Sequence, residues 1–437
     1  MTRGRGRLAV LRLLGRHLHL SRTGVAAFQK VQLARLVRHA YDRVPYYRTL
    51  LDRHRVRPEQ VAGPADLAGV PTTTKRDLQR ADPGAVVARG LDPRRLIAHR
   101  TSGWSGEPLA IRRTWTEERL YAAARRRAMR DFGLRRRDHR AVLGLVGRRD
   151  PRDHQLLQRI GQGLGLYRRT LVDALAAPAA IAARLGALHA DVVSGYPGVL
   201  ALVAGALRDE DRARGRPRLV VAGGEVLTPA ARERIARGFG APVCEIYGSH
   251  ECPLIAWQCA RGHGLHVWDY GVVLEILTDG RPARPGERGE VVVTALHSFA
   301  MPFLRYVLGD MVVAGETPCP CGAPFASIGG VEGRTIDHFP LANGRVVHPY
   351  ELVLATLEAA GPWLRQYRLL QETPDRVVLT VAPFDQPGPG ALARLRAAVS
   401  ARLGPGVSLR VDLVDEIHLE PSGKYRVSRS LVTAPDG

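Results

Sequence analysis

Lysine is almost absent from this chain of 437 residues, where it occurs only as Lys30, Lys75 and Lys424. Because lysine and arginine together number 64, nearly every other cation is an arginine. An ammonium group is a compact point charge and a guanidinium group is a broad planar fork, so neither replaces the other in a tight site. Each remaining lysine is therefore a candidate for a role that arginine cannot fill.

Long hydrophobic runs are also lacking. No apolar stretch reaches the roughly 20 residues that a membrane-spanning helix needs, which argues against a membrane protein. The basic N-terminal stretch is interrupted by Arg12 and Arg16 and lacks a small-residue cleavage site, which argues against a signal peptide. With 45% hydrophobic and 24% charged residues, the composition is that of a globular protein. We therefore expect a cytoplasmic protein with no membrane partner.

The net charge of +22 is not accompanied by a basic tail or by aromatic residues interleaved with cations. Arginines are spread along the chain and are densest between Arg125 and Arg140. This pattern favours a solvated arginine-rich surface over a nucleic-acid partner. The alternative, a basic protein that binds polyanions, predicts an affinity that falls steeply with salt.

The order of the expected elements predicts an α/β protein with two domains. Residues 1–60 are expected to be helical, and residues 95–250 alternate helices with buried strands at 141–147, 191–196, 218–224 and 242–248. This alternation is typical of a largely parallel sheet. Residues 265–315 have the turn-rich pattern of an antiparallel or barrel-like element. We expect a large domain over 1–333 and a small α+β domain over 334–437, where strand, helix, strand, helix and strand follow one another.

Two loops contain groups that can bind a nucleotide. In the segment Thr101 to Pro108, glycines and hydroxyl groups would leave N–H and O–H donors free to surround phosphate oxygens. The segment Tyr247 to Glu251 follows a strand at the edge where ligands gather in α/β sheets, with an aromatic ring for a base and a carboxylate for Mg²⁺. Taken alone, the first loop is more often an ordinary turn, and the second is at least as compatible with one.

Two further segments have candidate groups of this kind. Asp310 follows a glycine in RYVLGD, and its two carboxylate oxygens suit the two hydroxyl groups of a ribose. The pair Gly333 and Arg334 follows it, and Lys424 comes after a Ser-Gly turn near the C-terminus, where the cation would be exposed and mobile.

The ordered set TSGWSGEP, YGSHE, RYVLGD, GR and SGK resembles the motif series of the adenylate-forming enzymes. The segments VPYYR, PTTTKRDL, SGYPGVL, GGEVLT and LHSFAMPFLRY resemble the phenylacetate-CoA ligase branch and its CapK-like relatives. The resemblance covers residues 35–430. It implies that an acid and ATP form an acyl-adenylate, that coenzyme A takes the acyl group, and that the C-terminal domain rotates between these steps.

The resemblance also implies roles for matching positions. Asp310 would bind the ribose, Tyr247 the adenine and Glu251 Mg²⁺, while Arg334 would stand at the ribose and the domain junction and Lys424 would reach the acyl-phosphate centre. The catalytic residues would be Lys424, Glu251 and Arg334. The phosphate loop would comprise Thr101, Ser102, Gly103, Ser105 and Gly106. The remaining pocket residues would be Gly223, Gly224, Glu225 and Gly248 near the nucleotide, with Tyr196 and Pro197 beside the acid.

Two positions depart from the family pattern. Trp104 stands where a small or hydroxylated residue is usual, which affects the phosphate loop or narrows the acid pocket. Ile336 replaces the first of two acidic residues at the hinge, which affects the rotated conformation. One alternative to coenzyme A as the acceptor is an amine or a carrier protein. Another alternative is a degenerate ligase that only binds its ligands, but the presence of Lys424 argues against it. We expect an aryl or arylacetic acid and consider a homodimer. The sequence itself does not identify the acid, the acceptor or the oligomeric state.

Cysteines number only five, which argues against a disulfide framework. Cys319 and Cys321 share one turn, and Cys259 with His266 precedes a strand, so a closed Cys3His site for structural Zn²⁺ is predicted. His263 is the rival fourth ligand, and a loop with free thiols is the alternative without metal. Cys244 and Cys252 are interpreted as strand and pocket-wall residues.

Overall fold

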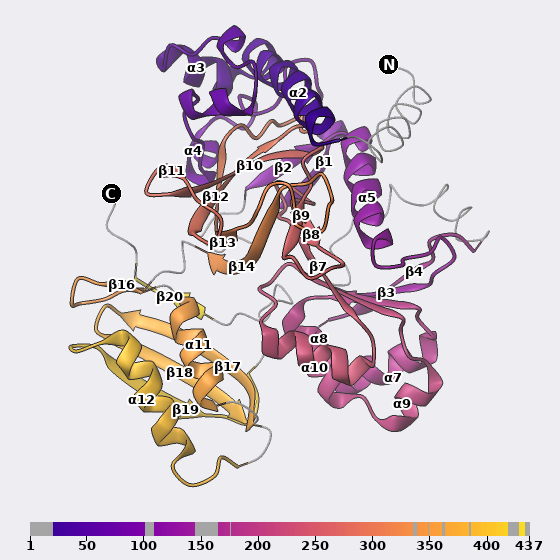
Figure 1. Ribbon diagram of the computed structural model, residues 1–437, viewed down its shortest axis with the longest axis vertical. Coiled ribbons are helices and arrows are strands. Elements are labelled where there is room, and N and C mark those ends of the chain that lie inside the picture. Colours follow the sequence, from indigo (N-terminus) through magenta and orange to yellow (C-terminus); the bar gives the residue numbers. More distant parts are fainter. Residues whose placement is uncertain are drawn as a thin grey trace. The chain divides into compact units, whose positions relative to one another are not determined.

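The computed structural model describes residues 21–100, 109–144, 165–174, 176–334, 339–347, 349–360, 363–383, 386–417 and 428–432. The chain forms two compact units, and Figure 1 labels their elements. The first unit draws on the segments Met1–Asp138, Leu219–Gly224 and Pro242–Val331, and the second on His139–Arg218, Glu225–Ala241 and Glu332–Gly437. The domain division predicted between residues 333 and 334 stays a prediction.

Two helices open the described part of the first unit, α2 (Arg22–Arg43) and α3 (Pro45–Arg53). The hydroxyl group of Ser21 caps α2 by accepting a hydrogen bond from the Gly24 N–H. The helix ends at Val44, whose extended backbone is the conformation that a following proline favours. Leucines of α2 are buried in a core shared with Leu296 and Leu304. The helical prediction is confirmed for this part of residues 1–60.

A mixed sheet makes up most of the first unit. Its strands lie in the order β11, β10, β12, β13, β14, β9, β8, β7, β6. Their bounds are β6 (Leu219–Gly223), β7 (Val243–Tyr247), β8 (Ala256–Gln258), β9 (Leu265–Val267), β10 (Val272–Thr278), β11 (Arg281–Pro282), β12 (Arg288–Ala295), β13 (Tyr306–Ala314) and β14 (Ser327–Arg334). β6 and β7 are parallel, whereas β10 pairs antiparallel with β12, as predicted for both regions. In the described part of the chain, these strands follow one another in one open sheet and do not close on themselves. The predicted barrel-like element is therefore not confirmed and stays a prediction.

A separate hairpin and one long helix also belong to the first unit. The antiparallel strands are β1 (Ile97–Arg100) and β2 (Ala110–Arg113). Helix α5 (Trp115–Arg130) follows directly, and its N-terminus is fixed by a capping box in which Thr114 and Glu117 exchange hydrogen bonds with each other's backbone N–H groups. Three short helical elements and one helix lie earlier in the chain: η2 (Pro58–Gln60), η3 (Pro64–Gly69), η4 (Pro93–Arg95) and α4 (Lys75–Arg80).

The second unit begins with parallel strands in the order β5, β3, β4. These are β3 (Arg140–Gly144), β4 (Arg169–Asp173) and β5 (Val192–Gly195), which confirms the predicted strands near 141 and 191. The helices of this part are α7 (Pro178–Leu188), α8 (Pro197–Ala206), α9 (Asp209–Arg214) and α10 (Pro229–Phe239). Three of them have proline in the first turn, where its missing N–H costs no helical hydrogen bond.

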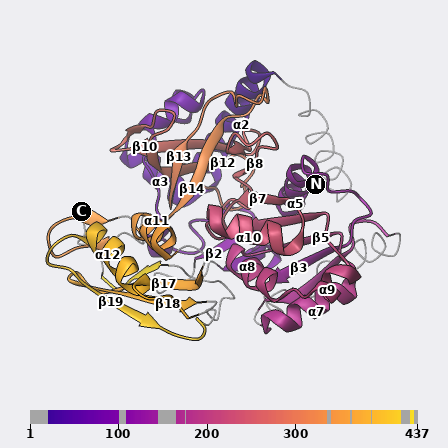
Figure 2. The same ribbon diagram turned by 60° about the horizontal axis from the view of Figure 1, so that its bottom comes forward.

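The C-terminal part of the second unit is an α+β arrangement. Its sheet has the order β19, β18, β17, β20, and both Figure 1 and Figure 2 show α11 and α12 on the same face of it. The elements are β15 (Phe339–Pro340), β16 (Val346–Val347), α11 (Pro349–Ala360), β17 (Leu364–Thr373), β18 (Arg376–Pro383), α12 (Ala391–Leu403), β19 (Ser408–Leu413) and β20 (Ser428–Ser430).

The predicted order of strand, helix, strand, helix and strand is wrong in this part, because the structure has two strands at each of the three positions where one was expected. β17 and β18 form an antiparallel hairpin, so two strands stand between the helices. The turn between them is Pro374 and Asp375, where proline presets the backbone angle and the Asp375 carboxylate accepts a hydrogen bond from the Thr373 hydroxyl group at 2.6 Å. The predicted rotation of this part stays a prediction.

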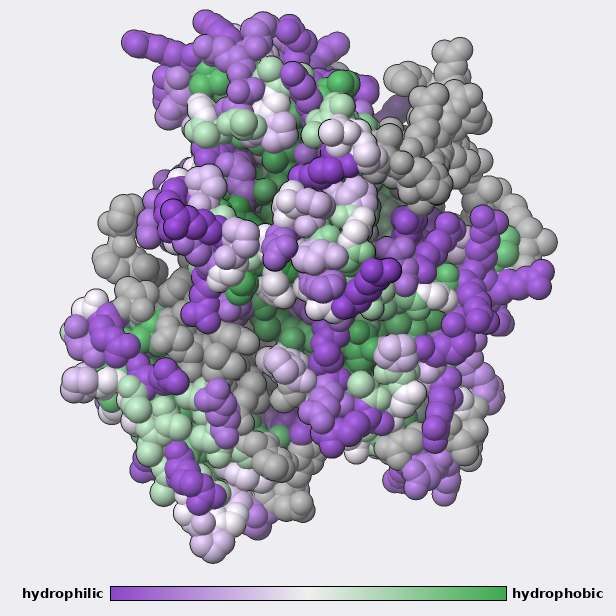
Figure 3. Space-filling model, viewed as in Figure 1, coloured by the Kyte–Doolittle hydropathy of each residue, from purple (hydrophilic) through white to green (hydrophobic). Residues whose placement is uncertain are grey.

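The surface agrees with the dispersed charge of the sequence. In Figure 3, most side chains over α2 and α3, at the top of the view, are hydrophilic. Exposed arginines of these two helices and of the turn that follows them include Arg35, Arg38, Arg43, Arg48, Arg53, Arg55 and Arg57. Among the described residues, none of the helices combines the length and the apolarity that crossing a membrane would require.

Candidate functional site

The end of β7 brings together two of the predicted nucleotide-binding residues. The Tyr247 hydroxyl group donates a hydrogen bond of 2.7 Å to the Asp310 carboxylate, and both side chains are buried. Gly309 precedes Asp310 with φ of +75°, a conformation that favours glycine. At Gly248 a side chain would meet the Pro253 carbonyl oxygen at 2.6 Å, so only glycine lets the chain turn here. The sheet therefore places an aromatic ring and a carboxylate side by side.

Glu251 lies in the tight loop that follows. The Ser249 hydroxyl group accepts a hydrogen bond from the Cys252 N–H at 3.1 Å, and the Ser249 N–H donates to the Cys252 carbonyl group at 2.8 Å. The Glu251 side chain is only 6% exposed, and its Oε1 accepts a hydrogen bond of 3.0 Å from the Tyr306 hydroxyl group. Burial raises the pKa of the Cys252 thiol, so this neighbour stays neutral and Glu251 is the ionisable group of the loop that can bind a cation.

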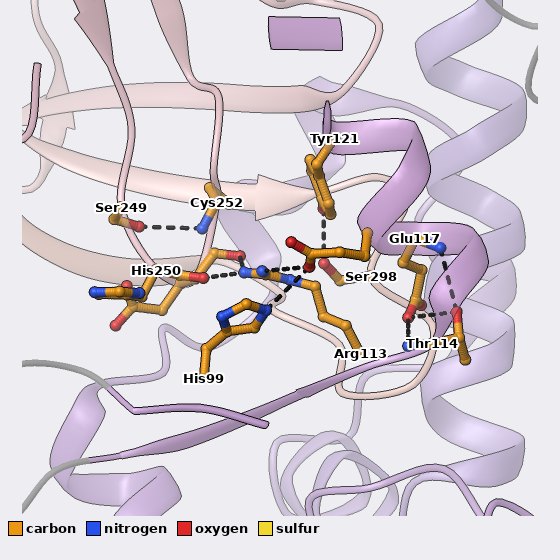
Figure 4. Close-up of polar contacts among 11 residues, drawn as sticks. His99, Arg113, Thr114, Glu117, Tyr121, Ser249, His250, Cys252 and Ser298 are labelled. Atoms are coloured by element: carbon orange, nitrogen blue, oxygen red, sulfur yellow. Dashed lines mark hydrogen bonds and ion pairs between the residues drawn. The ribbon is translucent and has the colours of Figure 1, made fainter. Parts of the chain in front are cut away.

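Arg113 and its partners form a polar network beside this loop, shown in Figure 4. The Arg113 guanidinium group donates to the carbonyl oxygen of His250 and to Glu118, whose carboxylate also binds His99 at 3.0 Å. Burial raises the pKa of Glu118, but the hydrogen bonds and the charges of His99 and Arg113 outweigh this effect and lower the pKa to about 2. No local sequence pattern indicates a role for Arg113, Glu118, His99 or Tyr306, because their contacts arise only in the folded chain.

The remaining predicted pocket residues fall in both units. In the first unit, a side chain at Gly223 would meet the Ile246 carbonyl oxygen at 2.5 Å, and Gly224 has φ of +84°. In the second unit, the Glu225 carboxylate accepts a hydrogen bond of 3.0 Å from the Gly198 N–H. Gly198 lies in the first turn of α8, immediately after Tyr196 and Pro197. Negative charge at a helix N-terminus is stabilising, so Glu225 holds the start of α8, and with it Tyr196 and Pro197.

The predicted metal ligands form one compact group. One ligand atom from each of Cys259, His266, Cys319 and Cys321 lies within 4.8 Å of the others, and His266 Nε2 is 3.2 Å from the Cys321 sulfur. The group contains His266, which lies on β9, and not the rival ligand His263. Three sulfurs and one imidazole nitrogen at this spacing are the donor set of a closed Zn²⁺ site.

Main-chain N–H groups support two of these sulfurs. The Arg261 N–H donates to the Cys259 sulfur and the Ala323 N–H donates to the Cys321 sulfur, each at 3.4 Å. Burial raises the pKa of Cys259, but hydrogen bonds from the N–H groups of His263 and Arg261 outweigh it, so the pKa is lowered. Burial raises the pKa of Cys319 to about 12. A bound cation would be needed to hold Cys319 as a thiolate.

Several predicted residues lie outside the described part of the chain. They are Thr101, Ser102, Gly103, Ser105, Gly106 and Lys424, together with the two departures Trp104 and Ile336. Arg334 is the last residue of β14, but its side chain is not among those that the structure describes. The roles expected for these residues stay predictions.

Comparisons with known proteins point to one family, although no family model matches the chain. The phenylacetate-coenzyme A ligase of Thermus thermophilus is 29% identical over 368 residues, covering 78% of each protein. The enzyme of the same name from Escherichia coli is 28% identical over 312 residues, covering 65% of this chain and 66% of that one.

The solved structures indicate the same fold. A 2-hydroxyisobutyryl-CoA ligase in the postadenylation state is similar with a TM-score of 0.74 and 23% identity, over 92% of this chain and 88% of that one. A benzoate CoA ligase from Burkholderia xenovorans is similar with a TM-score of 0.54 and 18% identity, over 80% and 71% of the two chains. The chain is therefore similar in sequence to phenylacetate-coenzyme A ligases, and its fold is that of acid–CoA ligases.

Proposed function

We propose that this protein joins a carboxylic acid of the aryl or arylacetic class to coenzyme A, through an acyl-adenylate formed with ATP. The observation that carries the proposal is the group at the end of β7, where Tyr247, Asp310 and Glu251 are buried together in a chain homologous to phenylacetate-coenzyme A ligases. An aromatic ring, a carboxylate for a ribose and a carboxylate for a cation are what the binding of ATP requires.

The reaction has two steps. The carboxylate of the acid attacks the α-phosphorus of ATP and pyrophosphate leaves, which gives the acyl-adenylate. The thiol of coenzyme A then attacks the acyl carbon, loses its proton and releases AMP. The reactants of the first step are anions, so positioning and positive charge lower its barrier more than a proton transfer would.

The residues divide these tasks. Asp310 holds the ribose hydroxyl groups and Tyr247 contacts the adenine, while Glu251 holds Mg²⁺, which would neutralise phosphate charge when bound. Lys424 and the loop of Thr101 to Gly106 supply further positive charge and donors to the phosphates. Tyr196 and Pro197, which begin α8, border the acid pocket.

The cysteine group is a second proposed site, one for structural Zn²⁺. Its support is the donor set of Cys259, His266, Cys319 and Cys321, with all donor atoms within 4.8 Å of one another. Four protein ligands leave no position for water or substrate, so such a site stabilises the segments around β8 and β9 rather than taking part in the reaction.

A panel of carboxylic acids tests the function. Pyrophosphate release is measured with ATP, Mg²⁺ and each acid, and thioester formation is measured after coenzyme A is added. We expect release with aryl or arylacetic acids and a thioester only with coenzyme A present. Release that needs an amine or a carrier protein instead would replace the proposed acceptor. No release with any acid, from protein that binds ATP, would contradict the proposed activity.

A further inference from the structure

Arg113 connects three segments that are far apart in the sequence. It ends β2, and its side chain is only 3% exposed. Its Nη2 donates to the main-chain carbonyl oxygen of His250 and, at 3.5 Å, to that of Glu251. Its Nη1 donates to Glu118 of α5 at 3.3 Å. Figure 4 shows the guanidinium group reaching from the hairpin to the loop of Ser249 to Cys252.

The guanidinium group itself is held from other sides. Glu118 Oε2, which Arg113 contacts, also binds His99 Nε2 at 3.0 Å, and His99 belongs to β1. The Arg113 Cζ lies 5.2 Å from the ring centroid of Tyr121, a favourable cation–π distance. The Tyr121 hydroxyl group and the Ser298 hydroxyl group are 2.8 Å apart and hydrogen-bonded. A buried cation with a carboxylate partner and a ring beside it is well fixed.

The two carbonyl contacts have a specific consequence for Glu251. The carbonyl group of His250 belongs to the peptide plane before the Glu251 Cα, and the carbonyl group of Glu251 belongs to the plane after it. Because each peptide unit is planar, holding both carbonyl groups restrains φ and ψ of Glu251 and hence the direction of its Cα–Cβ bond. At the other end, Oε1 accepts from Tyr306 at 3.0 Å. The carboxylate is thus fixed at its root and at its tip.

The same contacts involve the hairpin that flanks residues 101–108. His99 and Arg113 lie on one face of the hairpin, since Ile97 pairs with Arg113 and His99 is two residues further along β1. Residues 101–108 join β1 to β2 in the sequence and contain the predicted phosphate loop. A displacement of the hairpin therefore changes the position of the Arg113 guanidinium group and, through it, the Glu251 main chain.

We propose that Arg113 is a positioning residue, which couples the β1–β2 hairpin to the Glu251 loop and aims the Glu251 carboxylate at the divalent cation that accompanies ATP. This inference rests on the proposed function, in which Glu251 binds Mg²⁺. Arg113 touches neither ATP nor the acid in this scheme; it acts on the geometry of one ligand.

The test compares Arg113→Ala and Arg113→Lys with the matched control Arg112→Ala. Arg112 is the neighbouring arginine of β2 and contacts the Pro93 carbonyl group instead. For Arg113→Ala we expect the Mg²⁺ concentration at half-maximal pyrophosphate release to rise about tenfold or more, as is usual when a partner behind a metal ligand is removed. Calorimetry should show weaker ATP binding with Mg²⁺ and unchanged ATP binding without it. KM for the acid should not change.

The conservative variant provides a second readout. Arg113→Lys keeps a cation, but its single ammonium nitrogen lacks the planar fork that holds the two carbonyl groups and Glu118 at once, so it should fall between the native protein and Arg113→Ala. If Arg113→Ala does not fold, Glu118→Gln, which weakens the support of the guanidinium group, should still raise the Mg²⁺ requirement.

Two outcomes separate the inference from the function on which it rests. An unchanged Mg²⁺ requirement in a folded Arg113→Ala, together with a raised one in Glu251→Gln, would overturn the positioning role and leave the function standing. An unchanged requirement in Glu251→Gln would instead overturn the assignment of Glu251 as the magnesium ligand.

Discussion

The Tyr247 hydroxyl group donates a 2.7 Å hydrogen bond to the Asp310 carboxylate, which joins the end of β7 to β13. One oxygen of this buried carboxylate is thereby engaged, and the bond also fixes the plane of the Tyr247 ring. A ribose that binds here would find an acceptor already oriented, which lowers the entropy cost of binding. Under the proposed function the two residues have separable tasks: the ring would contact the base and the carboxylate would hold the sugar.

Asp310→Ala is expected to weaken ATP binding more than acid binding. Hydrogen bonds to a charged acceptor contribute about 1.5 to 3 kcal/mol, so KM for ATP should rise by roughly tenfold or more while KM for the acid stays near its native value. The matched control is Tyr247→Phe, which keeps the ring and the carboxylate and removes only the hydroxyl group. An unchanged KM for ATP in Asp310→Ala would show that Asp310 does not hold the ribose.

The protein is expected to be purified with about one zinc ion per chain, because a closed Cys3His site binds tightly. Cys319→Ser should lower the zinc content and the melting temperature while the folded enzyme keeps its KM values. Cys244→Ser is the matched control, since Cys244 is also a buried thiol but lies on β7 outside the group of four. Absence of any transition metal from protein purified without chelator would contradict the proposed site.

Because of Glu118, the free energy of unfolding should depend on pH in the acidic range. Its pKa is brought from 4.5 to about 2 in the folded protein, so its contribution is complete above pH 4.5 and is lost as the pH falls through about 2. The side chain is 27% exposed, and the contribution is at most about 3 kcal/mol. Glu118→Gln removes it, so native protein and variant should differ most near neutral pH.

Urea unfolding measured at several pH values checks this expectation. The difference in unfolding free energy between native protein and Glu118→Gln should shrink once the pH falls below 4.5. Glu210→Gln, the same change at an exposed position of α9, serves as the control and should show a small difference throughout. A difference for Glu118→Gln that is constant with pH would mean that its charge does not support the fold.

The sequence allowed the elements to be predicted where a local pattern decides them. Buried strands such as β6 and β7 are continuous apolar runs, and α2 has regular apolar spacing. The hairpin of β17 and β18 was predicted as a single strand, because the turn of Pro374 and Asp375 is only two residues long. Local pattern is a poor guide to such a boundary.

The site shows the same division between local and tertiary information. Tyr247 and Glu251 could be found because they share one short motif, and the cysteines because metal ligands have restricted spacing. Arg113 could not be found, since its meaning depends on His250 and Glu118, which the fold brings to it. One of many arginines in an arginine-rich chain carries no signal of its own in the sequence.

Lys424 provides the sharpest test of the proposed reaction. It follows the Ser422-Gly423 turn near the C-terminus of a chain with three lysines. Lys424→Ala should nearly abolish adenylate formation from acid and ATP, because the charge that develops on the α-phosphate loses its cation. Thioester formation from supplied acyl-adenylate should survive, since the predicted rotation of the C-terminal domain would withdraw the lysine before that step.

Two variants make the result specific to Lys424. Lys424→Arg should also be poor in the first step, because a planar guanidinium group does not reproduce a compact charge in a packed site. Lys30→Ala, which removes an exposed lysine of α2, should leave both half-reactions unchanged. Measured separately, the half-reactions decide the matter: equal losses in both for Lys424→Ala, or no loss in the first, would mean that Lys424 is a surface residue and that the domain rotation assigned to this chain is wrong.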